Sequence, residues 1–324
     1  MTSHEIFGLI EKEMSRVETE LESLSGSEIP LIRDIGRYIH NGGGKRVRPA
    51  ILLLAARMCG YGGATGPLLG AVIEMLHSAT LVHDDIIDNS STRRSQASVN
   101  ARWGNEISVL IGDWLYMTSF KIALAERQFR IMDILIEATR KMVEGELMQI
   151  EFNGSLEITE EQHLDISMRK TAFLFSAAAQ LGGVLGGAGA EHEERLRLYG
   201  MNIGLAFQLV DDVLDLTSDE RTLGKPVQSD LKEGKLTLPL IRLIKGGEPG
   251  HREIVRNAVV TRNADASVRE KIARLVMEYG AADYVMEKAR DYARKAEGYI
   301  EDFPDCDARC ALFAISSHIV ERDR

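Results

Sequence analysis

LVHDDIIDNSSTRR (Leu81–Arg94) and LVDDVLDLTSDER (Leu209–Arg221) both place aspartates in the order Asp-Asp-apolar-apolar-Asp between hydrophobic residues. Residues three, four or seven positions apart share one face of a helix, so this spacing predicts helices with their carboxylates gathered on one side. Each copy is followed by a polar turn that carries arginine. The repeat therefore indicates a helical protein in which both acidic faces have a role.

Helical periodicity extends over the rest of the chain. Apolar residues recur at intervals of three and four nearly everywhere, whereas the alternating pattern of a half-buried strand is rare. The seven prolines lie beside glycine or polar clusters or at the start of an apolar run, where helices begin or end. We therefore expect an all-α fold in one domain over residues 1–324. The predicted helices cover residues 4–24, 30–41, 49–60, 66–89, 105–128, 130–152, 160–188, 191–217, 235–245, 250–262, 267–299 and 308–322.

The composition excludes several classes of protein. Asp and Glu outnumber Lys and Arg by 49 to 39, and the net charge of -10 argues against a nucleic-acid partner, which needs a basic surface. The N-terminus lacks the basic start and apolar core of a secretory signal, and no segment reaches about 18 consecutive apolar residues, so we expect no membrane span. Three cysteines are too few for a disulfide framework. These features predict a cytoplasmic protein.

Other segments predict packing and not ligand binding. LGGVLGGAGA (Leu181–Ala190) carries two pairs of glycines four residues apart, a spacing that lets helices approach closely. The N-terminal helix has an acidic polar face, so we expect it to pack on the rest of the protein and not on a membrane surface. Cys306 and Cys310 share a helical face without further ligands, which indicates structural cysteines.

Each acidic motif is expected to gather its aspartates on one helix face with one other polar residue. The first face comprises His77, Asp84 and Asp88 with Asp85 at its flank, and the second comprises Gln208, Asp211, Asp212 and Asp215. Like charges at this spacing destabilise a helix, and apolar neighbours raise the cost. Carboxylate clusters suit a hard cation, and Mg²⁺ bridges one or two carboxylates to substrate phosphates. Two such faces, brought opposite each other, would hold a diphosphate through bridging metal ions.

Two simpler interpretations of the acidic motif fit less well. A solvated acidic face does not require a second copy with matching apolar flanks. A calcium-binding EF-hand needs alternating ligands and a central glycine, and neither copy contains them. The repeated motif therefore favours magnesium-bridged phosphate binding.

A glycine-rich basic segment, NGGGKRVRPAILLLAA (Asn41–Ala56), predicts an anion site. Its glycines let backbone N–H groups approach a ligand, and Pro49 suits the first turn of a helix. Lys45 and Arg48 add positive charge where the helix dipole already favours phosphate. The Walker spacing is absent, and no strand precedes the glycines as in a dinucleotide site. A glycine helix stop followed by solvated basic residues is the alternative.

Cations follow both acidic motifs. Arg93 and Arg94 come soon after the first copy and can grip phosphate in fork geometry. LGKPVQSDLKEGKLTLPL (Leu223–Leu240) places Lys225 and Lys235 after the second copy. Either pair alone is consistent with surface charge, but the matched placement indicates phosphate binding at both motifs.

The chain resembles the trans-isoprenyl diphosphate synthases, or polyprenyl synthetases, over essentially its whole length. The resemblance is carried by GGGKRVRP, LVHDDIID, the paired arginines, Lys170–Thr171, FQLVDDVLD and LGKP, in order and approximate spacing, and is greatest to the long-chain octaprenyl and heptaprenyl type. It implies an all-α bundle, usually homodimeric, around a deep central cavity, with two or three Mg²⁺ ions between two aspartate-rich helices. It also implies an enzyme that condenses isopentenyl diphosphate head to tail with an allylic diphosphate such as farnesyl diphosphate.

The resemblance assigns roles to residues at matching positions. The metal ligands would be Asp84, Asp85, Asp88, Asp211, Asp212 and Asp215. The allylic diphosphate would contact Arg93, Lys170, Lys225 and Lys235. The isopentenyl diphosphate site would comprise Lys45, Arg48, His77 and Arg94. The polar groups near the developing carbocation would be Thr171 and Gln208.

The implied mechanism needs no nucleophilic side chain. Mg²⁺ and cationic side chains stabilise the departing diphosphate, the isopentenyl double bond attacks the allylic cation, and a proton is lost to the released pyrophosphate. An apolar cavity would keep water from the cation. One residue departs from the family pattern, because Ser95 follows the paired arginines where many relatives have glycine. We expect that loop to be less free to bend, without loss of activity.

Small residues before the first motif predict a long product. Thr80 and Ala79 lie four and five residues before Asp84, facing down the path of the growing chain, and in short-chain relatives an aromatic residue commonly closes the tunnel in this region. The open tunnel favours long polyprenyl products, such as precursors of quinone side chains, with transient membrane contact on release. The candidates for a deeper floor are Met117, Phe120 and Met148. A bulky residue from another helix would instead give a farnesyl or geranylgeranyl diphosphate synthase.

Rival functions use the same residues differently. A metal phosphohydrolase of the HD type could use His83 and Asp84 with upstream histidines His40 and His77, but it leaves the second motif unexplained. A di-iron bundle could use Glu74-x-x-His77 but needs a second such pair. A terpene cyclase has no use for an isopentenyl site. A noncatalytic subunit of a prenyltransferase would be expected to lose metal aspartates, and all six are present.

Overall fold

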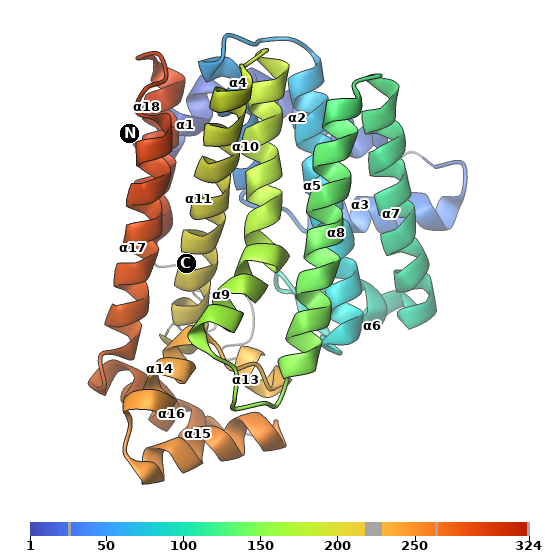
Figure 1. Ribbon diagram of the computed structural model, residues 1–324. Helices are drawn as coiled ribbons and strands as arrows, with labels where there is room; N and C mark the ends of the chain where they lie inside the picture. Colours follow the sequence, from blue (N-terminus) through green and yellow to red (C-terminus); the bar gives the residue numbers. More distant parts are fainter. Residues whose placement is uncertain (25–26, 218–228, 263–264, 323–324) are drawn as a thin grey trace. The chain divides into compact units, whose positions relative to one another are not determined.

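The computed structural model describes residues 1–24, 27–217, 229–262 and 265–322 (Figure 1). Two compact units are formed, and each gathers segments that are distant in the sequence. Unit 1 comprises residues 1–139, 174–200 and 297–315, and unit 2 comprises residues 140–173, 201–296 and 316–324.

Helices form nearly all the regular structure of the described residues, as predicted. In chain order the elements are α1 (Ser3–Leu9), α2 (Glu11–Leu24), α3 (Pro30–Asn41), α4 (Val47–Met58), α5 (Thr65–Ile87), β1 (Thr92–Arg93), β2 (Gln96–Ala97), α6 (Val99–Trp103), α7 (Asn105–Ala125), α8 (Phe129–Phe152), α9 (Glu160–Ser167), the π-helix η1 (Met168–Ala172), α10 (Phe173–Leu185), α11 (Ala190–Thr217), α13 (Ser229–Glu233), α14 (Leu238–Gly246), α15 (Pro249–Thr261), α16 (Ala266–Glu278), α17 (Ala281–Ile300) and α18 (Asp307–Glu321). The two strands form an antiparallel hairpin.

Most predicted helix ends agree with the structure within two or three residues, and the larger differences have local causes. The helix predicted over 4–24 is two helices separated at Ile10, and the one predicted over 267–299 is divided beside Gly280, whose φ is +62°. The hairpin, α6 and α13 are too short to produce a periodic pattern, so the sequence did not predict them.

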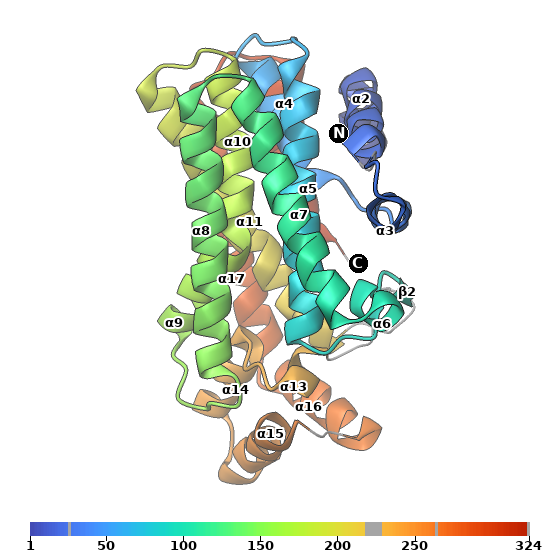
Figure 2. The ribbon, with the colours of Figure 1, turned by 90° about the vertical axis from the view of Figure 1, so that its right-hand side faces the viewer.

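Unit 1 is organised around α5, which packs against α2, α4 and α7 (Figure 2). Side chains such as Leu69, Ile73 and Leu76 are fully buried. A Cβ at Gly70 would lie 3.0 Å from Cγ2 of Val17, so α2 approaches α5 closely. The N-terminal helix therefore packs on the rest of its unit, as predicted.

Glycines at the C-terminal end of α10 and just after it allow close packing against α4, also in unit 1. A Cβ at Gly182 would lie 2.6 Å from Cβ of Ala55, and a Cβ at Gly186 would lie 2.2 Å from Cβ of Cys59. These spaces are too small for any side chain. The packing role predicted for this glycine repeat is confirmed for Gly182 and Gly186, whereas Gly187 has open space at its Cβ position.

Unit 2 buries one side of the C-terminal half of α11. Leu209, Val213 and Leu216 join a core that also contains Leu240 of α14 and Val255 of α15. In Figure 1, α14, α15 and α16 lie together in orange. Of the aspartates between these apolar residues, Asp212 and Asp215 are themselves buried, whereas Asp211 is half-buried.

Two helices are long and apolar enough to cross a membrane by length and composition alone. These are Thr65–Ile87 and Asn105–Ala125, with mean hydropathies of 1.2 and 1.3. The finding is weak, because the core helix of a soluble protein passes the same test, and 67% of the most apolar window of α5 is buried in the structure.

Candidate active site

The first aspartate motif lies at the C-terminal end of α5, in unit 1. Asp85 is only 2% exposed, and one of its carboxylate oxygens accepts hydrogen bonds from Arg93 Nε at 2.8 Å and Nη2 at 2.7 Å. Burial raises the pKa of Asp85, and the charge and hydrogen bonds of Arg93 oppose that rise. Asp84 and Asp88 are half-buried. Arg93 thus provides the positive charge that the clustered carboxylates require.

The arginines after the first motif are presented by the hairpin β1–β2. Arg93 pairs with Gln96, which leaves Arg94 and Ser95 as a two-residue loop with φ values of +50° and +62°. Left-handed backbone at both positions is the geometry of a type I′ turn, which favours glycine. Ser95 therefore adopts a backbone conformation in which glycine would be less strained, but the two-residue loop still forms with serine at this position.

The side chains predicted to bind isopentenyl diphosphate converge on His77. Burial lowers the pKa of His77 well below 6.5, and Arg48, Arg94, Arg93 and Arg46 lower it further in that order. His77 is therefore neutral at pH 7, and the arginines around it make the site electropositive. Such a cluster fits an anion. The fold therefore brings together Arg48, His77 and Arg94 of the predicted isopentenyl diphosphate site.

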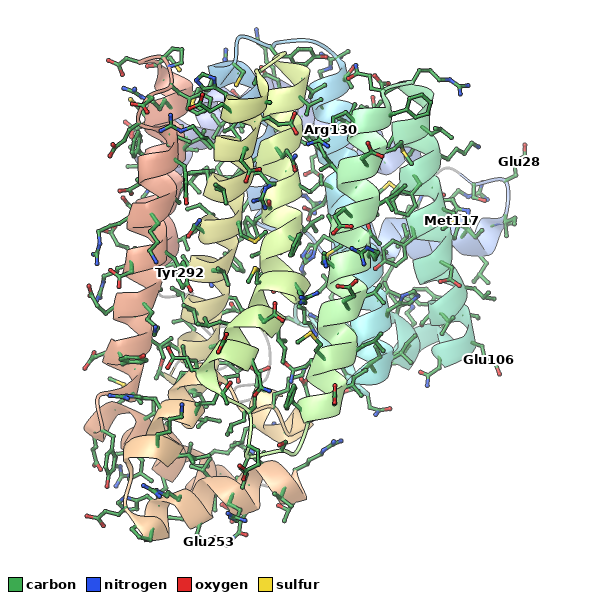
Figure 3. All side chains as sticks on the ribbon, viewed as in Figure 1. Glu28, Glu106, Met117, Arg130, Glu253 and Tyr292 are labelled. Atoms are coloured by element: carbon green, nitrogen blue, oxygen red, sulfur yellow. The ribbon has the colours of Figure 1, made fainter. Side chains whose placement is uncertain are left out.

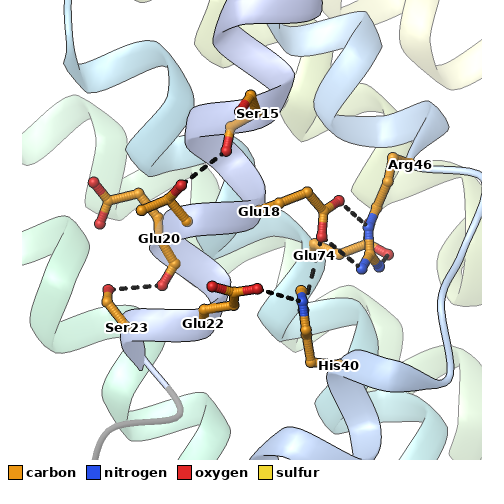
Figure 4. Close-up of polar contacts among 9 residues, drawn as sticks. Ser15, Glu18, Glu20, Glu22, Ser23, His40, Arg46 and Glu74 are labelled. Atoms are coloured by element: carbon orange, nitrogen blue, oxygen red, sulfur yellow. Dashed lines mark hydrogen bonds and ion pairs between the residues drawn. The ribbon is translucent and has the colours of Figure 1, made fainter.

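The remaining predicted residue of that site, Lys45, is exposed next to the cluster. Its neighbour Arg46 has a different role, because its guanidinium donates to Glu18 Oε1 at 2.7 Å and Glu74 Oε1 at 2.8 Å (Figure 4). Arg46 adopts left-handed φ of +50° immediately before α4. The pairing thus fixes the backbone between Lys45 and Arg48. Sequence reasoning missed Glu18 because it lies 28 residues away from Arg46.

The histidines needed by the phosphohydrolase alternative lie in separate environments. His83 Nε2 is 3.1 Å from the carbonyl of Val109, whereas His40 lies 3.6 Å from Glu22. Glu74, on which the di-iron alternative depends, is paired with Arg46. Among the described residues, no three His, Cys, Asp or Glu side chains are arranged to hold a metal ion. These contacts do not support either rival.

The aspartates of the first motif suit Mg²⁺ better than a metal ion whose ligands all come from the protein. Mg²⁺ keeps several waters and is bound through one or two carboxylates plus substrate phosphates, so it does not need a preformed set of three protein ligands. Half-buried Asp84 and Asp88 supply hard oxygen donors beside the arginine cluster. The donor chemistry of the first motif therefore fits the implied ion.

The second aspartate motif lies in the part of α11 that belongs to unit 2. Asp212 is 1% exposed, with Oδ2 2.8 Å from His163 Nε2 and Oδ1 accepting from Gln208 Nε2 at 2.8 Å. Burial raises the pKa of Asp212, and the contact with His163 opposes the rise. Asp215, also 1% exposed, accepts the backbone N–H of Asp230 at 3.3 Å.

Asp211 is paired with a residue near the end of the chain. Arg322 Nη2 lies 3.2 Å from Asp211 Oδ1, and the guanidinium stacks 3.9 Å from the ring of Phe207. Sequence reasoning missed Arg322 because nothing local distinguishes it from other surface cations. It also missed His163, although His163 lies seven and eight positions before Lys170 and Thr171 and so shares their helical face.

The Lys170–Thr171 pair lies in the π-helix η1, and a π-turn inside a helix often marks a functional site. Thr171 Oγ1 donates to Gln208 Oε1 at 2.7 Å, and Lys170 forms an ion pair with Glu146. A Cβ at Gly145 would lie 2.7 Å from the backbone N of Lys170, so glycine permits this approach of α8. The predicted pair is thus placed beside the second motif.

Of the two lysines predicted after the second motif, the structure describes Lys235. Lys235 is 9% exposed and pairs with Glu233 Oε2 at 2.5 Å. Its backbone N–H donates to the carbonyl of Asp230, the residue that contacts Asp215. Lys225 lies outside the described residues.

Of the two residues predicted to set the product length, one has a small side chain and the other has a hydroxyl that is hydrogen-bonded within its own helix. Ala79 is fully buried, and the Thr80 hydroxyl donates to the carbonyl of His77 at 2.7 Å. Of the candidates for the tunnel floor, Met117 is 63% exposed on α7 (Figure 3), so it does not close an internal tunnel of its own chain. Phe120 is half-buried, and Met148 packs against the core of unit 2.

Comparison with known proteins identifies the family. The sequence model of polyprenyl synthetases matches residues 29–276. The chain belongs to the polyprenyl synthetase family. It is 38% identical to an octaprenyl diphosphate synthase of Escherichia coli over the full length of both chains. It is 35% identical to an all-trans-nonaprenyl-diphosphate synthase of Rhodobacter capsulatus, covering 91% of this chain and 90% of that one.

A solved structure agrees with the sequence comparison. The crystal structure of a polyprenyl synthase from Caulobacter crescentus, complexed with calcium and isoprenyl diphosphate, superposes with a TM-score of 0.96 at 34% identity, covering 100% of this chain and 98% of that one. The predictions of a polyprenyl synthetase, of its all-α fold and of prenyl transfer as its enzymatic activity are confirmed. The single domain over 1–324 stays a prediction.

Proposed function

We propose that this polyprenyl synthetase performs Mg²⁺-dependent head-to-tail condensation of isopentenyl diphosphate with an allylic diphosphate such as farnesyl diphosphate. The observation that carries the proposal is the gathering of Arg48 and Arg94 around His77, in the same unit as the carboxylates of the first motif. An anion site and a set of hard oxygen donors together suit a diphosphate and its metal ion.

Each predicted group has a defined task in this reaction. Two or three Mg²⁺ ions, when bound, supply positive charge to the allylic diphosphate. Their ligands would be Asp84, Asp85, Asp88, Asp211, Asp212 and Asp215. Arg93, Lys170, Lys225 and Lys235 would contact the allylic diphosphate, and the guanidinium of Arg93 has N–H donors beyond those used by Asp85. Lys45, Arg48, His77 and Arg94 would hold isopentenyl diphosphate while its double bond attacks the cation.

The proposed product is a long all-trans-polyprenyl diphosphate, such as a precursor of quinone side chains. Ala79 and Thr80 place no bulky side chain on this face of α5, although Ala79 itself is fully buried, and the hydroxyl of Thr80 is turned to the backbone of its own helix. The octaprenyl and nonaprenyl names of the relatives agree with this length. We place the enzyme in the cytoplasm, with transient membrane contact when the hydrophobic product leaves.

We also propose a homodimer formed through α7. Leu110, Met117 and Leu124 recur every seven residues on this helix and are 67%, 63% and 45% exposed. A stripe of large apolar residues at this spacing suits packing against another helix. Light scattering on the purified protein should give twice the monomer mass, and Leu110→Glu with Met117→Glu should give the monomer.

The test of the reaction is product analysis. The protein is incubated with Mg²⁺, labelled isopentenyl diphosphate and farnesyl diphosphate, and the product length is measured by chromatography. Products of six to ten isoprene units are expected. Accumulation at four units would favour the short-chain alternative. Folded protein without elongation from any allylic primer would contradict the proposed reaction and favour a noncatalytic subunit.

A further inference from the structure

Four side chains of unit 2 form an unbroken chain of hydrogen bonds that ends at the second aspartate motif. Thr171 Oγ1 donates to Gln208 Oε1 at 2.7 Å, and Gln208 Nε2 donates to Asp212 Oδ1 at 2.8 Å. His163 Nε2 lies 2.8 Å from the other oxygen, Asp212 Oδ2. These hydrogen bonds join α9, η1 and α11. His163 alone among the four has no role in the reaction described above.

The direction of this chain follows from the chemistry of its members. A carboxylate only accepts hydrogen bonds, so the amide NH₂ of Gln208 must face Asp212. The amide oxygen of Gln208 then faces Thr171, and the Thr171 hydroxyl must donate its one hydrogen to it. Any other neighbour of the Thr171 hydroxyl therefore faces the lone pairs of its oxygen and not its hydrogen.

His163 holds the end of the chain in place. It is 6% exposed and Asp212 is 1% exposed, so water cannot readily replace this contact. Ser167 Oγ lies 3.5 Å from the same ring nitrogen, a much longer approach than that of Asp212. The Asp212 carboxylate therefore cannot rotate about its Cβ–Cγ bond without breaking its contacts with both His163 and Gln208.

We propose that His163 is a positioning residue that orients Asp212 and, through Gln208, aims the lone pairs of Thr171 at the allylic cation. This inference rests on the proposed function. Thr171 acts by electrostatics, because an oxygen lone pair stabilises a neighbouring cation whereas the hydrogen of an O–H group opposes it. Orienting the hydroxyl before the reaction avoids reorganisation when the cation forms.

The experiment compares two substitutions at one position. His163→Phe keeps a planar ring but removes the donor, and His163→Gln places an amide donor near the position of the ring nitrogen. We expect kcat to fall about 10- to 100-fold in His163→Phe, the range typical of groups that orient a metal-binding carboxylate. The KM for isopentenyl diphosphate should stay unchanged, whereas the melting temperature should fall, because Asp212 loses a buried hydrogen-bond partner. His163→Gln should restore most of the lost kcat.

Two further measurements separate this role from its alternatives. In the double variant His163→Phe/Gln208→Ala, the loss of kcat should match that of Gln208→Ala alone, because both changes interrupt the same chain. Because Asp212 is also a proposed metal ligand, binding of Mn²⁺ with pyrophosphate, measured by electron paramagnetic resonance, should weaken in His163→Phe, but saturating metal should not restore kcat. Additive losses, or a kcat restored by excess metal, would overturn the proposal.

The proposed function and this inference fail in different ways. Wild-type protein that elongates no allylic primer would remove the reaction itself. An active wild type with an equally active His163→Phe would leave the reaction intact and remove the role of His163.

Discussion

The two aspartate motifs are nearly identical in sequence but are stabilised by different partners. In the first, Asp85 pairs with the guanidinium of Arg93, which lies eight residues later. In the second, Asp212 is held by Gln208, four residues earlier, and by His163, which is 49 residues away. Identical motifs therefore do not imply identical environments. The first motif is completed by local sequence, and the second depends on helices brought together by the fold.

The largest expected effect tests what the motifs have in common. If both bind the metal ions, Asp84→Ala and Asp211→Ala should each lower kcat by about 10³-fold, since metal ions contribute several kcal/mol of transition-state stabilisation. Steady-state kinetics at saturating Mg²⁺ measures this. Asp133→Ala, at an exposed position on α8, is the control and should be fully active. Loss of activity in only one of the two variants would mean that the other motif has no catalytic role.

A second prediction tests the difference between the buried aspartates. Burial raises the pKa of both Asp85 and Asp212, so ionisation of either opposes folding. Asp212→Asn removes a buried charge, and we expect the free energy of unfolding at neutral pH to rise by about 1 kcal/mol. Asp85→Asn also removes a buried charge, but it leaves the guanidinium of Arg93 without its carboxylate, so the two effects oppose each other. The gain in stability should thus be larger for Asp212→Asn than for Asp85→Asn.

The pH dependence gives this comparison a second measurement. A carboxyl whose pKa is raised in the folded state stabilises the protein below its unfolded pKa, and this stabilisation is lost as pH rises through the folded value. Denaturant unfolding in the presence of a chelator should therefore give equal stability for wild type and Asp212→Asn in acid. The difference should grow as pH rises above the ordinary Asp value of 3.8. A constant difference at every pH would contradict the assignment to ionisation.

A third prediction concerns the anion site beside the first motif. Glu18→Gln weakens the pairing that holds Arg46 between Lys45 and Arg48, so we expect the KM for isopentenyl diphosphate to rise about 10-fold, as for loss of one charged hydrogen bond. The kcat and the KM for the allylic diphosphate should be unaffected. Glu20→Gln is the control, on the same helix but outside the Arg46 cluster (Figure 4). Equal KM values in both variants would assign Glu18 a packing role alone.

The same contrast explains what could be predicted from the sequence. Helical periodicity and the local spacing of aspartates and arginines predicted the fold class and the groups of the first motif, because those contacts span at most one or two turns. The pairing of Arg46 with Glu18 and of Asp212 with His163 depends on helices that the sequence does not place together. The break at Gly280 was missed because apolar periodicity continues on both sides of it.

The smallest expected effect concerns the turn that presents the arginines. Ser95 has a φ of +62°, where a side chain costs about 1 kcal/mol relative to glycine. The greater freedom of glycine in the unfolded chain cancels about half of that gain, so Ser95→Gly should raise the melting temperature by about 1–2 °C. Ser91→Gly, just before the hairpin, lacks the positive φ and should lower it slightly. If Ser95→Gly also lowered the KM for isopentenyl diphosphate, strain in this turn would be weakening the binding of the substrate by Arg94. The first aspartate motif would then depend on backbone geometry as much as the second depends on helix packing.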